Sequence, residues 1–175
     1  VQYATANNTA VAPIDFTDAS GTLTFSPGVV SQSVSVLVQG DTNYETNESF
    51  FLILSDATGG TIADGQGVGT ITNDDPIPAI SIDDVTVSEG NDAGAGVSAI
   101  FTVNLSNASS QTVSVEYATS GGSAGASDYT STLGTLVFAP GQTTRSVTVP
   151  VRADTMYEAD ESFLVQLASA SNATI

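Results

Sequence analysis

Residues 134–151 have the sequence Gly-Thr-Leu-Val-Phe-Ala-Pro-Gly-Gln-Thr-Thr-Arg-Ser-Val-Thr-Val-Pro-Val. Apolar residues recur at every second position on both sides of Ala139-Pro140-Gly141, which is a typical turn sequence. A period of two buries one face of a strand, because successive side chains of a strand point to opposite sides. The stretch therefore predicts two strands joined by a turn.

The same alternation extends through the chain, and no stretch combines helical periodicity with caps. It is found at Leu23/Phe25, Val34/Val36/Val38, Ile80/Ile82, Val85/Val87 and Val113/Val115/Tyr117. Residues 50–54 and 100–105 are more continuously apolar, which predicts central core strands. Ser26-Pro27-Gly28 and Gly59-Gly60 are further turn signals. The pattern predicts an all-β fold of immunoglobulin-like β-sandwiches, each with about seven strands in roughly 110 residues.

The chain contains an internal repeat. Val1-Gln-Tyr-Ala-Thr5 matches Val115-Glu-Tyr-Ala-Thr119 after a shift of 114 residues, and from Asp15 onward the shift is 113 residues. Residues 63–114 occur once. Pro76 and Pro78 favour an extended connector. We therefore expect a first repeat over residues 1–75 that lacks its first strands, a proline linker over 76–78, and a second repeat over 79–175 that lacks its last strand.

Each repeat holds a segment that the other lacks. Residues 80–105 open the second repeat, and residues 68–75 close the first. One explanation is a window cut from a longer tandem array. The other is that a neighbouring subunit completes the ends by adding a strand.

The composition is strongly acidic. Nineteen Asp and Glu face two Lys and Arg, so the formal net charge is −17. This balance argues against a nucleic-acid partner and against direct contact with an anionic membrane surface. Cys and His are absent, which excludes disulfides, thiolate metal sites and imidazole zinc sites. Among the common braces of small extracellular domains, oxygen-ligated metal remains available.

Acidic residues are concentrated at equivalent positions of the two repeats. Asp41-Thr-Asn-Tyr-Glu-Thr-Asn-Glu-Ser-Phe50 returns 113 residues later as Asp154-Thr-Met-Tyr-Glu-Ala-Asp-Glu-Ser-Phe163. Crowded carboxylates repel one another unless a cation lies between them. Ca²⁺ accepts six to eight oxygens in flexible geometry, whereas Mg²⁺ demands a tighter octahedron. The two acidic runs therefore predict calcium.

In order along the chain, Gly-Thr-Leu-x-Phe-x-Pro-Gly, Asp-Thr-x-Tyr-Glu-x-x-Glu-Ser-Phe and Gly-Thr-Ile-Thr-Asn-Asp-Asp resemble the Calx-beta domain. That family includes calcium-sensing domains of sodium–calcium exchangers and repeats of large bacterial extracellular proteins. The resemblance covers nearly the whole chain and implies a sandwich with calcium bound by loops at one end.

The resemblance also implies metal ligands, residue by residue. In the first repeat they are Asp15, Asp41, Glu45, Glu48, Asp74 and Asp75, with the carbonyl of Asn43 as an extra. In the second repeat they are Glu89, Asp128, Asp154, Glu158 and Glu161, with the carbonyl of Met156. We expect neither set to be complete, since the first-strand Glu of one repeat would precede residue 1 and the closing acids of the other would follow residue 175.

Several of these residues have alternative interpretations. Asp15 and Asp128 are also suited to forming turns by accepting hydrogen bonds from their own backbone. The paired glutamates of each acidic run also fit a solvated face, and Asp74 and Asp75 also fit exposure beside the linker. Tyr44 and Tyr157 are predicted to pack and pin the acidic loops rather than to contact a substrate.

Three classes of function follow. The first is a calcium-binding structural or adhesive repeat of a long extracellular or cell-surface protein or filament, stiffened by Ca²⁺, with neighbouring repeats or identical subunits as partners. The alternative is a regulatory calcium-sensor domain pair of a membrane transporter. The third is an enzyme that uses a carboxylate pair such as Asp41 and Glu45 on glycosidic bonds. The chain has no His, Cys, P-loop or nucleophile elbow, so we expect it not to be an enzyme.

Overall fold

The computed structural model describes residues 1–91 and 96–175, and these residues form strands and loops. The chain divides into two compact units. The first consists of Val1–Thr42 and Thr46–Asp74, and the second of Asn43–Glu45 and Asp75–Ile175. The predicted opening segment of the second repeat, residues 80–105, includes residues 92–95, which lie outside the described part. Within residues 1–91 and 96–175, the structure contains no helix with the length and hydropathy of a membrane span.

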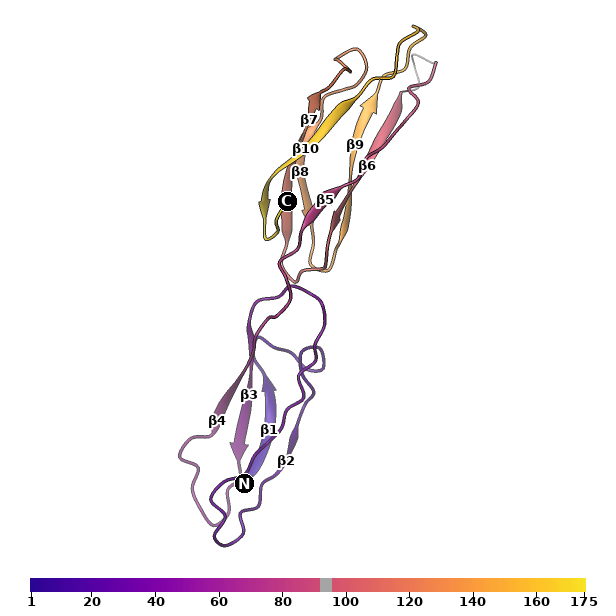
Figure 1. The fold of residues 1–175 in the computed structure, drawn as a ribbon. Helices are drawn as coiled ribbons and strands as arrows, with labels where there is room; N and C mark the ends of the chain where they lie inside the picture. The colour runs from indigo at the N-terminus through magenta and orange to yellow at the C-terminus, as the bar shows by residue number, and fades with distance from the viewer. Residues whose placement is uncertain (92–95) are drawn as a thin grey trace. The chain divides into compact units, whose positions relative to one another are not determined.

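The first unit is built on one antiparallel sheet (Figure 1). Its strands are β1 (Gln2–Asn7), β2 (Ser20–Thr22), β3 (Glu48–Ser55) and β4 (Gln66–Ile71). Their order is β2-β1-β3-β4, so β3 lies between two neighbours. The prediction that the apolar run 50–54 is a central strand is confirmed.

The second unit contains two three-stranded sheets, with orders β10-β7-β8 and β5-β6-β9. The strands are β5 (Ile80–Ile82), β6 (Val97–Leu105), β7 (Val113–Gly121), β8 (Leu133–Phe138), β9 (Thr144–Val151) and β10 (Phe163–Ser171). β6 pairs with both β5 and β9, as predicted for a central strand over 100–105.

The cores of the two units differ in size. In the second unit, both sheets direct alternate side chains into a common core, including Val103 from β6, Val115 from β7 and Val149 from β9, each 0% exposed. In the first unit the buried cluster comprises Ala10, Phe16 and Phe50. The rings of Phe16 and Phe50 stack with centroids 4.6 Å apart.

The two predicted Pro-Gly turns form. Val29 N donates to Ser26 O and Gln142 N donates to Ala139 O, each at 2.9 Å. Gly28 and Gly141 have φ of 85° and 79°. A type II turn requires a positive φ at its third position, which favours glycine there, and proline is common at its second position.

Three predicted strands do not form. β2 ends at Thr22, short of Leu23/Phe25, and residues 31–37 and 83–90 are not in strands. A strand requires a hydrogen-bonded neighbour, and β6 supplies one for β9 in the second repeat, whereas among the described residues no strand lies beside residues 31–37. Val85 and Val87 still pack against the second core. Over the described residues the units thus have four and six strands rather than about seven each.

Candidate metal centres

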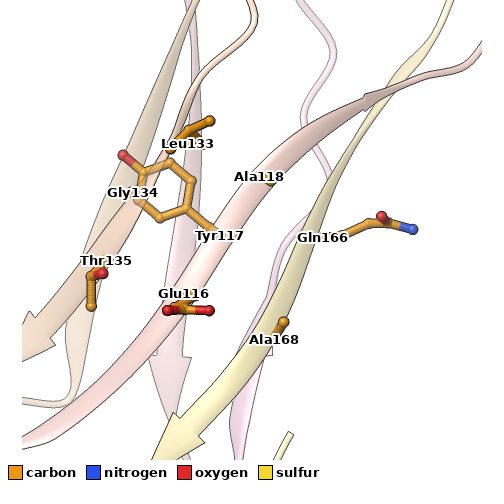
Figure 2. A pocket seen from close by; sticks show the side chains of 8 residues that line it. All are labelled: Glu116, Tyr117, Ala118, Leu133, Gly134, Thr135, Gln166 and Ala168. Carbon is orange, nitrogen blue, oxygen red and sulfur yellow. The ribbon is translucent and has the colours of Figure 1, made fainter.

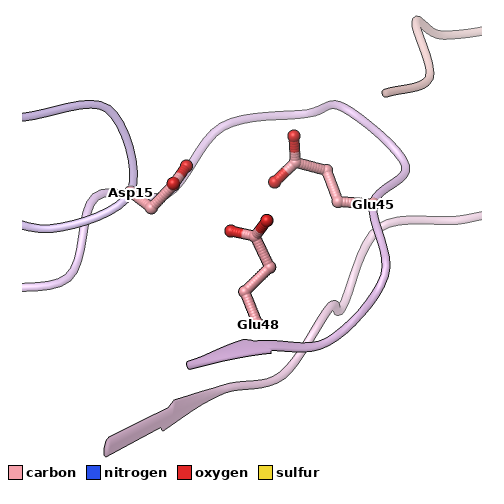
Figure 3. Close-up of side chains that lie close together, drawn as sticks. All are labelled: Asp15, Glu45 and Glu48. Carbon is pink, nitrogen blue, oxygen red and sulfur yellow. The ribbon is translucent and has the colours of Figure 1, made fainter. Parts of the chain in front are cut away.

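Three carboxylates of the first repeat converge (Figure 3). Asp15 lies in the loop between β1 and β2, Glu45 in the acidic loop, and Glu48 at the start of β3. One oxygen from each lies within 4.8 Å of the others, and all three residues are half-buried. Figure 3 shows the three side chains directed toward one another.

The second repeat repeats this arrangement. Asp128, Glu158 and Glu161 each offer an oxygen within 4.8 Å of the other two, with Asp128 half-buried and both glutamates exposed. These residues are the counterparts of Asp15, Glu45 and Glu48 after the shift of 113 residues. The structure therefore brings the same three positions together twice.

The spacing of these oxygens suits one ion shared by three carboxylates. Ca²⁺ lies about 2.3–2.6 Å from each ligand oxygen, so two ligands of one ion are at most about 5 Å apart. Three negative charges at such separation repel one another when no cation intervenes. Each cluster can thus contribute part of an oxygen shell for a divalent ion.

Asp15 and Asp128 also accept hydrogen bonds from the backbone of their own turns. The alternative interpretation of these two residues as turn-formers is therefore confirmed. Asp15 Oδ2 accepts from Val11 N at 2.7 Å, and Asp128 Oδ2 accepts from Gly125 N at 2.6 Å. The backbone N–H of Gly125, with a smaller contribution from the Ser127 hydroxyl, lowers the pKa of Asp128 below 3.8. A carboxylate has two oxygens, so the turn can hold the side chain in place while the ionised group faces its neighbours.

The pKa values of the two glutamates of the second cluster shift in the opposite direction, upward. Partial desolvation raises the pKa of Glu158 above its usual 4.5, with further increases from the negative charges of Asp154, Asp128 and Glu89. A hydrogen bond with Asp128 raises the pKa of Glu161, as do the charges of Glu158 and Glu89. Glu89 and Asp154, both predicted ligands, therefore lie close enough to act on the cluster.

The remaining predicted ligands are placed less closely. Among the described residues, Asp41, Asp74, Asp75, Glu89 and Asp154 lie outside the two groups of three. Asp154 Oδ1 accepts from Met156 N at 2.7 Å, which shapes the acidic loop. Asn47 Oδ1 accepts from Asn73 N at 2.9 Å and so brings the segment after β4 to the acidic loop of the first repeat.

The two loop tyrosines differ. Tyr44, in the Asn43–Glu45 segment of the second unit, is half-buried, and its N–H donates to Ala108 O at 2.9 Å. Tyr157 is 99% exposed, so the prediction that it packs and pins its loop is wrong. The acidic loop of the second repeat is held instead by its end, at Ser162.

That anchor was not predicted from the sequence. Ser162 N donates to Ser123 Oγ at 2.9 Å, and Ala124 N donates to Ser162 O at 3.0 Å. In the first repeat, Ser49 N donates to Thr9 Oγ1 at 2.8 Å, and Ala10 N donates to Ser49 O at 2.9 Å. The signal was a hydroxyl at equivalent positions, Thr9 and Ser123, after a shift of 114 residues. Each hydroxyl fixes the residue that directly follows the last glutamate of its cluster.

A hollow on the face of β7, β8 and β10 is of a different kind (Figure 2). Its lining consists of Glu116, Tyr117, Ala118, Leu133, Gly134, Thr135, Gln166 and Ala168. The ring of Tyr117 lies over Gly134, where an added Cβ would be 2.9 Å from the tyrosine oxygen. This surface carries one carboxylate, that of Glu116, and lacks the crowding of acid seen in the two clusters.

Comparison with known proteins gives matches of several lengths. Sodium/calcium exchanger 1 of Mus musculus is 44% identical over 61 residues, which is 34% of this chain and 6% of the exchanger. The exchanger of Canis lupus familiaris is 46% identical over 59 residues, 33% of this chain and 6% of its own length. Adhesion G-protein coupled receptor V1 of Danio rerio is 27% identical over 183 residues, covering 91% of this chain and 3% of the receptor. The chain thus spans a small part of each relative.

Among solved structures, the CBD12 crystal structure from CALX1.2 covers 97% of this chain at 25% identity, with a TM-score of 0.46 and 66% of its own length matched. The family model of the Calx-beta domain matches residues 1–76 and again residues 72–174. The chain therefore belongs to the Calx-beta domain family and contains two consecutive copies of the domain.

Proposed function

We propose that this chain is a tandem calcium-binding module that responds to calcium in the manner of a regulatory sensor. Each repeat binds Ca²⁺ through its cluster, with Asp15, Glu45 and Glu48 in the first and Asp128, Glu158 and Glu161 in the second. Glu89 and Asp154 add negative charge beside the second cluster. The observation that carries the proposal is the duplicated convergence of three carboxylates at equivalent positions.

A bound ion changes the energetics of the loops. Without it, partial desolvation raises the pKa of Glu158 and a hydrogen bond with Asp128 raises that of Glu161, and the negative charges of neighbouring acids add to both pKa increases. With a bound ion, the same carboxylates become ligands that connect the loop carrying Asp15 or Asp128 to the acidic loop of the same repeat. Because metal binds the folded state, stability increases by about 2.7 kcal/mol at a hundredfold excess of free Ca²⁺ over Kd.

The sensor type of function is supported by the exchanger relatives, whose identity of 44% and 46% is concentrated in about a third of this chain. Adhesion G-protein coupled receptor V1 supports a second candidate, a calcium-stiffened structural link, because its weaker similarity extends over 91% of the chain. An extracellular location, cell adhesion and a filament belong to this second candidate.

Calcium affinity distinguishes the two candidates. Sensor sites are tuned to about 10⁻⁷–10⁻⁵ M, and extracellular modules to about 10⁻⁴–10⁻³ M. Isothermal titration of the whole chain with Ca²⁺ after chelation should give micromolar Kd values and a change in small-angle scattering on binding. Kd values near a millimolar with unchanged scattering would support the structural link instead.

The site itself is tested by paired variants. Glu45→Gln/Glu48→Gln should remove the heat of binding of the first repeat, and Glu158→Gln/Glu161→Gln that of the second. In chelator, each variant should unfold at the temperature of the parent protein or above it, because the substitution relieves repulsion. This separates loss of binding from loss of folding.

Asp56→Asn/Glu116→Gln is a charge-matched control with one substitution in each repeat, both outside the clusters. It should retain the full Ca²⁺-induced rise in melting temperature, while Mg²⁺ at equal concentration gives a smaller rise. A rise that persists when all four glutamates are replaced would refute the assignment of the sites.

A further inference from the structure

Asn47 joins the acidic loop of the first repeat to the segment that follows β4. Its side-chain oxygen Oδ1 accepts a hydrogen bond from the backbone N–H of Asn73 at 2.9 Å. Asn47 directly precedes Glu48, a member of the first cluster. Asn73 directly precedes Asp74, a predicted ligand that lies outside that cluster. One hydrogen bond therefore joins the two residues that adjoin these carboxylates.

The sheet of the first unit ends at this point. β3 pairs with β4 from Ile53↔Gln66 to Glu48↔Ile71, and β4 ends at Ile71. Ile71 also packs against the buried cluster of the first unit. The segment after β4 thus leaves a fixed point at Ile71 and is held again, two residues later, by the side chain of Asn47.

The residue type at position 47 suits this role. An asparagine side chain can accept a backbone hydrogen bond in place of a peptide carbonyl. Asn47 is exposed, so burial does not account for its presence. The equivalent position of the second repeat holds Asp160, whose carboxylate can also accept a hydrogen bond. Both repeats therefore have an oxygen acceptor at this position.

The bond limits the distance between Asp74 and Glu48. Consecutive Cα atoms are about 3.8 Å apart, so two residues that each adjoin one end of a hydrogen bond stay close together. The side chain of Asp74 is exposed. Ca²⁺ takes six to eight oxygens, so a site built on three carboxylates has room for a further ligand.

We propose that Asn47 is a positioning residue of the first calcium site, which holds the segment after β4 so that Asp74 joins the first cluster as a ligand of the same ion. This assignment rests on the proposed function, because it adds a ligand and its support to a site proposed there. Asn47 acts through the backbone of Asn73 and does not bind the ion itself. Its effect on calcium binding therefore passes through Asp74.

The test uses the whole chain with Glu158→Gln/Glu161→Gln as the background, so that titration with Ca²⁺ reports the first repeat. Asn47→Leu, which has a similar volume and no acceptor, should weaken binding about fivefold, as expected for the loss of one hydrogen bond. Thr46→Val, which removes an exposed hydroxyl from the same loop, is the matched control and should bind like the background protein.

A double-mutant cycle separates positioning of Asp74 from a general effect on the loop. Asp74→Asn should weaken binding about tenfold in the background protein but only about twofold when Asn47→Leu is also present, because the carboxylate is then no longer held near the ion. Additive losses from the two substitutions would overturn the proposal.

A second measurement does not require calcium. In chelator, the Asn73 amide should exchange its hydrogen about tenfold faster in Asn47→Leu than in the background protein, because the bond that protects it is lost. Asn47→Asp, which introduces the residue found in the second repeat, should restore the protection. Equal exchange in all three proteins would overturn the proposal.

The outcomes also distinguish this proposal from the proposed function. Ca²⁺ binding by the background protein with an unchanged Kd in Asn47→Leu would overturn the role of Asn47 alone. Absence of Ca²⁺ binding by the background protein would overturn the proposed calcium site of the first repeat together with it.

Discussion

Asp128 makes two kinds of interaction, one with the backbone of its own turn and one with neighbouring glutamates. Its Oδ2 accepts from Gly125 N, and its charge faces Glu158 and Glu161. The hydrogen bond favours the ionised carboxylate, while the ionised carboxylate disfavours ionisation of its neighbours. The backbone hydrogen bond thus favours the ionised form of Asp128, and the charge of Asp128 contributes to the raised pKa values of Glu158 and Glu161.

The hydroxyl anchors yield a first prediction. Thr9→Val and Ser123→Ala each remove one hydrogen bond to the residue that follows the last glutamate of a cluster. A hydrogen bond of this kind contributes about 1 kcal/mol, so the Ca²⁺ affinity of the affected repeat should fall several-fold.

Titration calorimetry of each single variant provides the measurement. Thr9→Ser, which retains the hydroxyl, serves as the matched control and should bind like the parent. Equal affinity in Ser123→Ala and the parent protein would show that the anchor does not position the site.

The raised pKa values yield a second prediction. A carboxyl whose folded pKa exceeds its unfolded value stabilises the fold below the unfolded pKa, and this contribution is lost as pH rises through the folded pKa. For Glu158 and Glu161 in calcium-free protein, stability should therefore increase as pH falls from neutral toward 4.5. Asp128 has the opposite sign, and its contribution is lost as pH falls below 3.8.

In the presence of calcium, acidification should instead weaken the second repeat, because protons and Ca²⁺ compete for the same oxygens. Affinity of the second repeat should fall on acidification through the raised pKa values, and binding there should release protons. Calorimetry in buffers of different ionisation enthalpy measures that release. Glu158→Gln/Glu161→Gln should abolish it, and release that persists in this variant would place the protons elsewhere.

At the scale of elements, a strand depends on its neighbour as much as on its own sequence. Val147/Val149/Val151 form β9 because β6 lies beside them, whereas Val34/Val36/Val38 carry the same alternation and remain outside the sheet except for a bridge at Val38. Hydrogen bonds between strands satisfy the backbone, so an unpartnered alternating segment is left as an edge.

The packing of β4 on β3 yields a third prediction. A Cβ at Gly69 would overlap the ring of Phe50, which stacks on Phe16 in the core of the first repeat. Gly69→Ala should destabilise this repeat by about 1–3 kcal/mol through overpacking.

Gly67→Ala on the same strand is the control, since its Cβ would lie 3.9 Å from the nearest atom. Chemical denaturation in chelator measures both variants. Equal destabilisation by the two would show that strand propensity, rather than the Phe50 ring, is responsible.

The two repeats have similar sequences but cores of different size. Among the described residues, twelve buried hydrophobic residues form the cluster of the second unit, and three form that of the first. Buried apolar area is the main favourable term in folding, so we expect the first unit, as described, to be the less stable of the two.

Hydrogen exchange in chelator tests this fourth prediction. Amides of β1 and β3 should exchange faster than those of β6 and β7, because local opening follows local stability. Calcium should slow exchange in both units. Slower exchange in β1 and β3 than in β6 and β7 would contradict the ranking of the cores.

The sequence alone was sufficient for the all-β class, the duplication, the two Pro-Gly turns and the central positions of β3 and β6. These follow from period-two alternation, from turn residues with restricted φ, and from long apolar runs, all of which are local properties. The resemblance to the Calx-beta domain also placed Asp15, Glu45, Glu48 and their counterparts among the expected ligands.

The folded chain determines which of those acids meet within 4.8 Å, which hydroxyls anchor the acidic loops, and which alternating segments become strands. Tyr157, expected to pack, is exposed, and residues 31–37, expected to pair, are not in a strand. The reason is the same in each case: local sequence sets what a residue can do, but convergence and pairing depend on segments distant in the chain that lie beside it.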